Sequence, residues 1–111
     1  NYGNHDLSGG VSSFWAESSL KISPIEQVEM LQRLYINDFN FDVDNIQTVK
    51  NALLLSSTAN GNLYGKTGTG NINGENISGW FIGYVETSDN TYFFALNIGA
   101  TENATGSKAK V

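Results

Sequence analysis

The apolar positions of the chain follow two different periods. Between residues 24 and 35 they recur every three or four positions, which is the spacing of one face of an α-helix. From residue 62 onward they alternate with polar residues or form short apolar runs, a pattern typical of β-strands. The pattern predicts helices first and an antiparallel sheet afterwards, which is an α+β fold with an antiparallel sheet flanked by helices.

The first helix has a strong start signal. Ser23 suits the N-cap, Pro24 suits the first helical position, and Glu26 completes a capping box with Ser23. We expect this helix to run to about Tyr35. The residues expected on its apolar face are Ile25, Val28, Leu31, Leu34 and Tyr35.

A second helix is predicted to begin at an Asp44 cap and to direct Ile46, Val49, Leu53 and Leu54 inward. Residues 56–61, which close with Asn-Gly, are predicted to form a turn.

The sheet is predicted from the period-two region. Residues 62–67 form one strand, residues 71–76 a polar loop, and residues 78–86 pair with residues 91–99 across a hairpin at 87–90. The last two runs are apolar on both faces, so we expect the sheet to be covered on each side. Residues 103–111 resemble the first turns of a closing helix.

Composition narrows the function classes. With 111 residues and 40% apolar content, the chain has the size of one domain and can build a core. A net charge of −5 argues against a nucleic-acid partner, because phosphate binding favours a basic surface. The chain contains no cysteine and one histidine, so we expect neither a metal site nor a Ser-His-Asp triad. No apolar run approaches the length of a membrane span, and no membrane contact is expected within this segment.

The most informative stretch is residues 63–70. Lys66 supplies a compact positive charge, and Thr67 and Thr69 supply hydroxyls beside it. The neighbouring glycines, including Gly68, lack a Cβ and allow close approach to the backbone. This arrangement suits a small anionic substrate that lies along a strand edge.

Lys66-Thr67-Gly68 resembles the K-T-G box of the penicillin-recognising serine proteins. Four further segments stand in the order of one branch of that family: Tyr2-Gly3-Asn4, Phe14-Trp15, residues 19–23 (SLKIS) and residues 79–85 (GWFIGYV). Together they resemble the C-terminal part of class D (oxacillinase-type) β-lactamases and of the sensor domains of β-lactam-inducible receptors. The residues in these segments are typical of Gram-positive members. The resemblance implies that residues 1–111 form a single, incomplete domain of the serine β-lactamase/penicillin-binding fold, whose N-terminal part is absent.

The family mechanism, as the resemblance implies it, uses a serine in an upstream S-x-x-K box that β-lactams acylate. The lysine of that box carries a carbamate derived from carbon dioxide and acts as general base; no other cofactor is expected. Trp15 matches the tryptophan whose indole N–H donates to that carbamate. Lys66 polarises the site, and the N–H of Thr69 is one of two oxyanion-hole donors.

The resemblance also implies substrate-binding residues. Tyr2 and Asn4 belong to the box that borders the catalytic pocket, and Thr67 and Gly68 belong to the box that binds the substrate carboxylate. Many class D enzymes place an arginine in the C-terminal helix for that carboxylate. This chain has Lys108 there, a point charge in place of a bidentate fork.

Residues 18–21 (SSLK) satisfy S-x-x-K, but they follow the Y-G-N box, whereas the catalytic box precedes it in the family. We therefore interpret this match as coincidental. The catalytic serine is expected upstream, in a longer parent protein.

The first functional hypothesis is a class D-like serine β-lactamase that hydrolyses the β-lactam amide through an acyl-enzyme. The parent is expected to be an enzyme, and this segment alone to be inactive. The main alternative is the extracytoplasmic sensor domain of a signalling receptor, which is acylated without turnover. A peptidoglycan transpeptidase and a binding domain with an incidental K-T-G are weaker alternatives. All but the last imply a β-lactam ligand and an extracytoplasmic location, and the sequence leaves the oligomeric state open.

Overall fold

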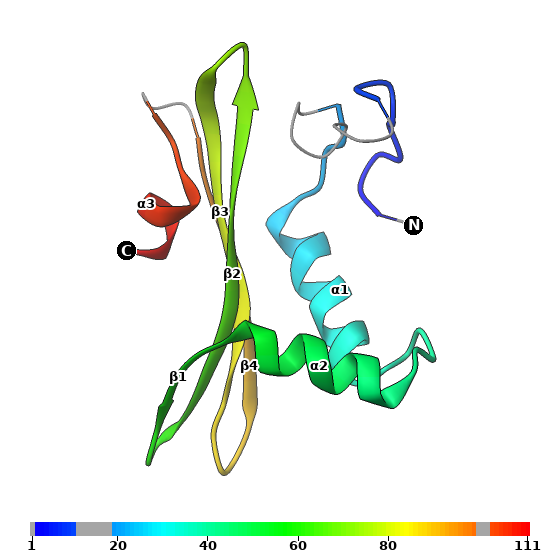
Figure 1. Ribbon diagram of the computed structural model, residues 1–111, viewed down its shortest axis with the longest axis vertical. Helices are drawn as coiled ribbons and strands as arrows, with labels where there is room; N and C mark the ends of the chain where they lie inside the picture. Colours follow the sequence, from blue (N-terminus) through cyan, green and yellow to red (C-terminus); the bar gives the residue numbers. More distant parts are fainter. Residues whose placement is uncertain (1, 11–18, 100–102) are drawn as a thin grey trace.

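The computed structural model describes residues 2–10, 19–99 and 103–111. Within these residues, four antiparallel strands follow one another in chain order, β1-β2-β3-β4. They span Leu54–Thr58 (β1), Gly61–Ile72 (β2), Glu75–Glu86 (β3) and Thr91–Gly99 (β4). Helix α1 (Pro24–Tyr35) lies on one side of the sheet and the short helix α3 (Gly106–Lys110) on the other (Figure 1). The predicted α+β architecture is confirmed.

Helix α1 begins and ends where the sequence predicts. The Ser23 side chain accepts from the Glu26 backbone N–H at 3.2 Å, and the Glu26 carboxylate accepts from the Ser23 N–H at 2.8 Å. This reciprocal pair is the predicted capping box. It pairs two of the backbone donors that a helix start leaves without intrahelical partners.

The apolar face of α1 differs from the prediction in its first turn. Leu31 is buried, as expected, but Ile25 is 72% exposed and Gln27 is only 7% exposed. Gln27 tolerates this position because its amide Nε2 donates to the Tyr2 hydroxyl at 2.6 Å, which offsets part of the loss of water.

Helix α2 (Val43–Leu53) begins two residues earlier than the predicted Asp44 cap would place it. The N-cap is Asp42, whose Oδ1 accepts from the Asp44 and Asn45 N–H groups at 2.9 and 3.2 Å. Both aspartates suit a cap, and only the backbone geometry chooses between them. No α2 residue is fully buried: Ile46 and Leu53 are half-buried and Val49 is exposed. Leu54, also predicted to point inward from this helix, is instead the first residue of β1 and is exposed.

Strand β1 was missed by the sequence reasoning, which assigned residues 56–61 to a turn. Ser56, Ser57 and Thr58 pair with Leu63, Asn62 and Gly61 across a tight turn at Ala59-Asn60. All five residues of β1 are exposed, so the strand lacks the alternating apolar pattern that identifies a half-buried strand.

The polar loop predicted at residues 71–76 is also wrong, because β2 and β3 continue almost to its centre. Only Asn73 and Gly74 form the turn, both with positive φ (52° and 83°). Asn-Gly is the preferred pair for such a two-residue hairpin. The flanking Asn71 and Asn76 side chains hydrogen-bond each other at 3.1 Å, which links the two strands beside the turn.

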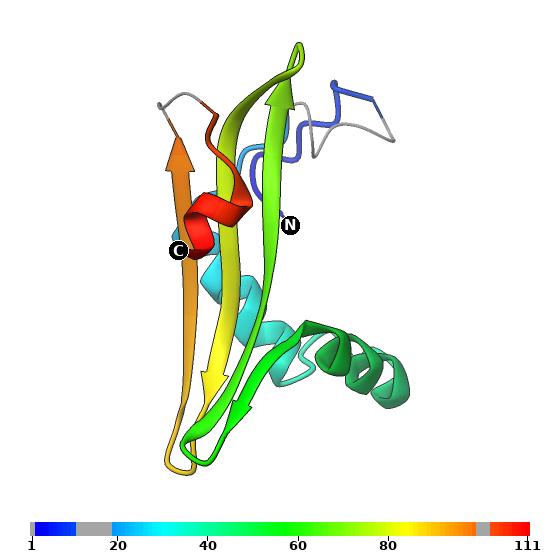
Figure 2. The ribbon, with the colours of Figure 1, turned by 60° about the vertical axis from the view of Figure 1, so that its left-hand side comes forward.

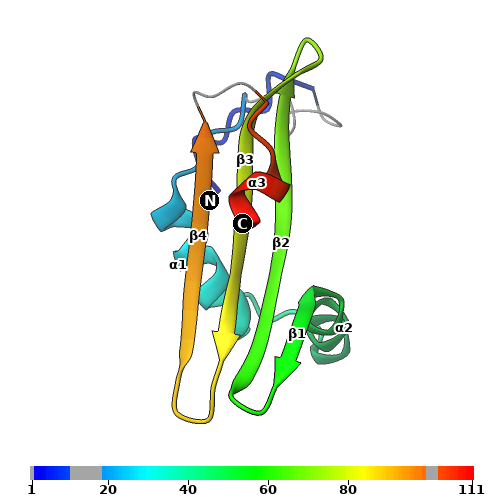
Figure 3. The ribbon, with the colours of Figure 1, turned by 90° about the vertical axis from the view of Figure 1, so that its left-hand side faces the viewer.

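The β3–β4 hairpin is confirmed, with register from Ser78↔Gly99 to Glu86↔Thr91. Figures 2 and 3 show α3 crossing β2 and β3, with α1 behind the sheet. The close approach of α3 depends on glycine. A Cβ on Gly79 would lie 2.0 Å from the Thr105 carbonyl oxygen, and one on Gly106 would lie 2.6 Å from that of Gly68.

Candidate functional site

The site begins at a free strand edge. Strand β1 pairs with β2 only from Gly61 to Tyr64. Beyond Gly65, the edge of β2 that faces away from β3 has no strand partner among the described residues. Along Lys66–Gly70, an edge without a strand partner among the described residues is therefore combined with residues that are mostly small, as the sequence predicts for a ligand-binding edge.

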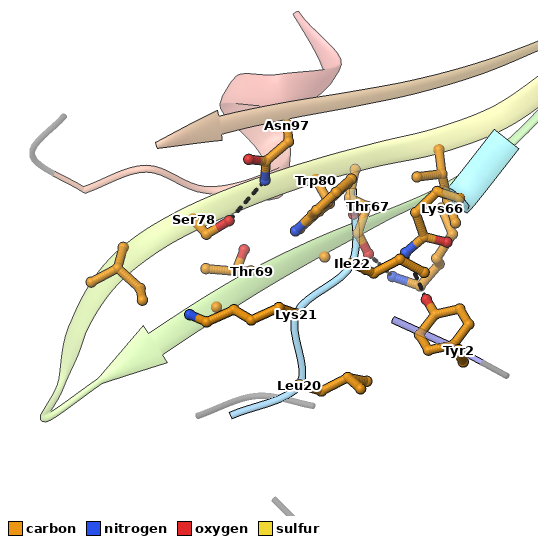
Figure 4. Close-up of a pocket in the computed structure, with 15 residues that line it drawn as sticks. Tyr2, Leu20, Lys21, Ile22, Lys66, Thr67, Thr69, Ser78, Trp80 and Asn97 are labelled. Atoms are coloured by element: carbon orange, nitrogen blue, oxygen red, sulfur yellow. Dashed lines mark hydrogen bonds between the residues drawn. The ribbon is translucent and has the colours of Figure 1, made fainter. Parts of the chain in front are cut away.

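A cavity of about 440 Å³ opens beside this stretch. The segment 20–22 passes across the strands and forms one wall, while β2 and β3 form the other (Figure 4). The lining residues are Tyr2, Leu20, Lys21, Ile22 and Gln27 on the first side, and Lys66, Thr67, Gly68, Thr69, Gly70, Ile77, Ser78, Trp80, Ile82 and Asn97 on the sheet side. The structure thus brings Tyr2 to the K-T-G strand from a distant part of the sequence.

Lys66 places a cation at the cavity. Its Nζ donates to the Thr67 carbonyl oxygen at 2.6 Å, and the residue is exposed. An ammonium group carries three N–H donors, so a lysine bonded to a neighbouring carbonyl can still donate to an anionic ligand.

Thr69 is held from the opposite side of the sheet. Its Oγ1 accepts from the Gly106 N–H at 3.0 Å, at the start of α3. A Cβ on Gly106 would lie 2.8 Å from the Thr67 Cβ, so α3 rests directly on the K-T-G strand. The Thr69 hydroxyl therefore helps to hold α3 against the strand, and its O–H group remains free to donate a hydrogen bond.

Most of the lining residues were not predicted from the sequence, among them three with polar side-chain groups on β3 and β4: Ser78, Trp80 and Asn97. The Asn97 side chain donates to Ser78 Oγ at 2.8 Å and to the Gly79 carbonyl oxygen at 3.2 Å. Strand register could have identified them, because Trp80 stands opposite Gly68 on one side and opposite Asn97 on the other. Side chains of directly paired residues share a sheet face.

Tyr2 is held as a protonated phenol. Burial raises its pKa above the ordinary value, and the hydrogen bond from Gln27 lowers it by a smaller amount. At neutral pH Tyr2 can therefore donate a proton in a hydrogen bond but cannot act as a base.

The other predicted site residues lie elsewhere. Asn4 does not line the cavity, and its side chain bonds to backbone groups of residues 6, 19 and 21. Lys108 belongs to α3, on the far side of the sheet from the 20–22 segment, and does not line the cavity either. Trp15 lies outside the described residues.

Within the ranges that the structure describes, no group of three or more His, Cys, Asp or Glu side chains is placed to hold a metal ion. No helix in those ranges is long and apolar enough to cross a membrane.

Together, the fold and the site define a class. A helix-flanked antiparallel sheet whose K-T-G strand presents a free edge to a cavity is the arrangement expected of penicillin-recognising serine proteins. The family model described as the penicillin binding protein transpeptidase domain matches residues 1–111, and the chain belongs to this family.

Similar proteins fall into two groups within the family. The chain is 51% identical to the regulatory protein BlaR1 of Bacillus licheniformis over 108 residues, 97% of this chain and 18% of BlaR1. It superposes on the solved C-terminal domain of the Bacillus licheniformis BlaR penicillin-receptor with a TM-score of 0.86 and 50% identity, covering 97% of this chain and 44% of that one. It superposes on the class D β-lactamase BAT-2 with a TM-score of 0.82 and 41% identity, covering 98% of this chain and 44% of that one. The predicted resemblance is confirmed, and the chain spans less than half of these relatives.

Proposed function

We propose that the chain is part of a penicillin-binding domain in which β-lactams acylate a serine carried by another part of the parent protein. One observation carries the proposal: Lys66-Thr67-Gly68 lies on an unpaired strand edge that lines a cavity, in a chain matched along its whole length by the penicillin-binding family. The serine oxygen attacks the β-lactam carbonyl, the ring C–N bond breaks, and the nitrogen receives a proton.

The residues of this chain bind and polarise the substrate. The charge of Lys66 attracts the substrate carboxylate, and Thr67 and Gly68 provide polar contact and close backbone approach. The Thr69 N–H supplies one oxyanion-hole donor, a kind of group whose loss typically lowers the rate by about 10²–10³. Trp15 donates its indole N–H to a lysine carbamate on the upstream part. Lys108 would need a movement, or a different substrate pose, to reach the carboxylate from α3.

Hydrolysis of the acyl-enzyme by class D chemistry is the first candidate for the step after acylation. Acylation without turnover, as in a sensor domain, is the second, and it is favoured by the higher identity to BlaR1 and the BlaR domain (51% and 50%) than to BAT-2 (41%). Either role places the domain outside the cytoplasm, where β-lactams reach the cell wall.

The experiment uses the full-length parent and a fluorescent penicillin. We expect covalent labelling on a serine of an S-x-x-K box that precedes Asn1 in the parent. Release of the label within minutes supports the hydrolase, whereas a label that persists for hours supports the sensor. A parent that is not labelled contradicts both candidates.

Replacing Lys66 with Ala in the parent is expected to slow acylation by at least about 10², because the variant loses the positive charge that stabilises the developing negative charge. Stopped-flow acylation rates measure the effect. Lys110→Ala serves as a control with the same charge change, because Lys110 is an exposed residue at the end of α3 and does not line the cavity. Equal rates for wild type and Lys66→Ala would mean that the K-T-G match is incidental.

A further inference from the structure

The Tyr2-Gly3-Asn4 box makes a dense set of contacts with the segment that follows residue 18. The Asn4 backbone N–H donates to the Lys21 carbonyl oxygen at 2.8 Å. The Asn4 Oδ1 accepts from the Lys21 and Asp6 N–H groups at 2.9 and 3.1 Å, and its Nδ2 donates to the Ser19 carbonyl oxygen at 3.1 Å. Both lone pairs of the Asn4 amide oxygen are therefore occupied by backbone donors.

Each residue type of the box fits this contact. Gly3 has φ of +59°, and a Cβ at this position would lie 2.0 Å from the Lys21 carbonyl oxygen, so only glycine allows the two segments to approach. Tyr2 reaches past the segment to Gln27 on α1. We call the contact between residues 2–6 and residues 19–22 the Y-G-N clip.

The clip fixes one wall of the cavity. Leu20, Lys21 and Ile22 line the cavity opposite β2, whereas Asn4 itself does not. Helix α1 begins only at Pro24, so residues 19–22 are not held in place by helical hydrogen bonds. Their distance from the K-T-G strand therefore depends on hydrogen bonds from outside the segment. Asn4 supplies such bonds to Ser19 through its side chain and to Lys21 through both its side chain and its backbone.

From this geometry we propose that Asn4 is a positioning residue: it makes no contact with the β-lactam and acts by holding the wall formed by residues 20–22 at the distance from β2 that acylation requires. The inference rests on the proposed function. It differs from the direct substrate contact that the family resemblance implies for Asn4, and the two roles predict different ligand dependence.

The test measures acylation efficiency of the full-length parent with two ligands, benzylpenicillin, which carries an acylamino side chain, and imipenem, which does not. We expect Asn4→Ala to lower the efficiency by about 10- to 100-fold with both ligands, because a displacement near 1 Å at a reacting site has effects of this size. Asn4→Asp keeps the two acceptor contacts but places a carboxylate oxygen against the Ser19 carbonyl oxygen, so it is also expected to lower the efficiency with both ligands.

The matched control is Asn45→Ala, on the exposed surface of α2, and it is expected to leave acylation unchanged. Amide hydrogen exchange at Lys21 and Asp6 gives a second readout, and both N–H groups should exchange faster in Asn4→Ala than in wild type.

Two results would overturn the inference. A loss confined to benzylpenicillin would mean that Asn4 contacts the acylamino group. A lower melting temperature with an unchanged acylation rate of the folded protein would mean that the clip serves stability alone. A wild-type parent that neither ligand acylates would instead overturn the proposed function, and the inference would fall with it.

Discussion

Gln27 is the buried polar side chain of the described core, and it is only half satisfied. Its Nε2 donates to Tyr2, but no described group pairs with its buried Oε1. An unpaired buried acceptor costs about 1–3 kcal/mol. The Tyr2 hydroxyl is thus the one described partner of a side-chain amide whose oxygen is buried.

Tyr2→Phe is expected to destabilise the parent by about 1–3 kcal/mol, because both ends of the Gln27 amide would then be unpaired. The free energy of unfolding in urea measures the change. Tyr92→Phe removes the same hydroxyl from a residue that is 57% exposed, and its effect should stay within about 0.5 kcal/mol. Equal effects of the two substitutions would show that the Tyr2–Gln27 bond contributes nothing measurable.

At the scale of elements, a second polar link joins α1, α2 and β3 at the end of the sheet remote from the cavity. The Glu86 carboxylate accepts from the Tyr35 hydroxyl at 2.5 Å and from Lys50 Nζ at 2.9 Å. Lys50 also lies 5.3 Å from the Tyr64 ring centroid, within range of a cation–π interaction. One carboxylate therefore joins three elements.

This link makes stability depend on pH. Burial alone would raise the pKa of the Glu86 carboxyl, but hydrogen bonds, led by that from Tyr35, outweigh it and hold the pKa below its ordinary value. The carboxylate therefore stabilises the fold above about pH 4.3, the ordinary glutamate pKa, and this contribution is lost as pH falls through the lower folded value.

Glu86→Gln is expected to lower the melting temperature of the parent by several degrees at pH 7, since it removes two charge-assisted hydrogen bonds. The difference from wild type should shrink as the pH falls through the folded pKa of Glu86, which lies below the ordinary glutamate value. Glu75→Gln, at an exposed strand start, is the control. A difference that stays constant between neutral and acidic pH would contradict the role assigned to Glu86.

The contact of α3 with β2 gives a prediction that links packing to chemistry. Gly106→Ala places a methyl group within 2.8 Å of Gly68 and Thr67 atoms, most of them backbone, so either α3 or the K-T-G strand must shift. We expect destabilisation by about 1–3 kcal/mol and slower acylation. In Gly99→Ala the nearest atom would be 3.6 Å away, and both quantities should remain near wild type. Slower acylation in both variants would contradict the role assigned to the α3 contact.

At the scale of the whole molecule, the sequence predicts features that depend on local signals. The α1 capping box, the β3–β4 hairpin and the K-T-G strand each have such a signal and are confirmed. Strand β1 escaped prediction because none of its residues is buried. Ser78 and Asn97 were not predicted as site residues, because their place beside the cavity depends on strand register. The Y-G-N clip was not predicted either, because it joins residues that are 15 to 17 positions apart in the sequence.

The unpaired edge of β2 has a consequence for how the domain behaves in concentrated solution. Exposed N–H and C=O groups in an extended strand are a template on which a second chain can add, which is how sheets grow into aggregates. Between Gly65 and Gly70, however, three of six residues are glycine, which is depleted in strands, and Lys66 adds a charge that would repel its counterpart in a second copy. The composition that admits a small ligand therefore also discourages a second copy of the same strand, so the edge can stay open to ligands without promoting self-association.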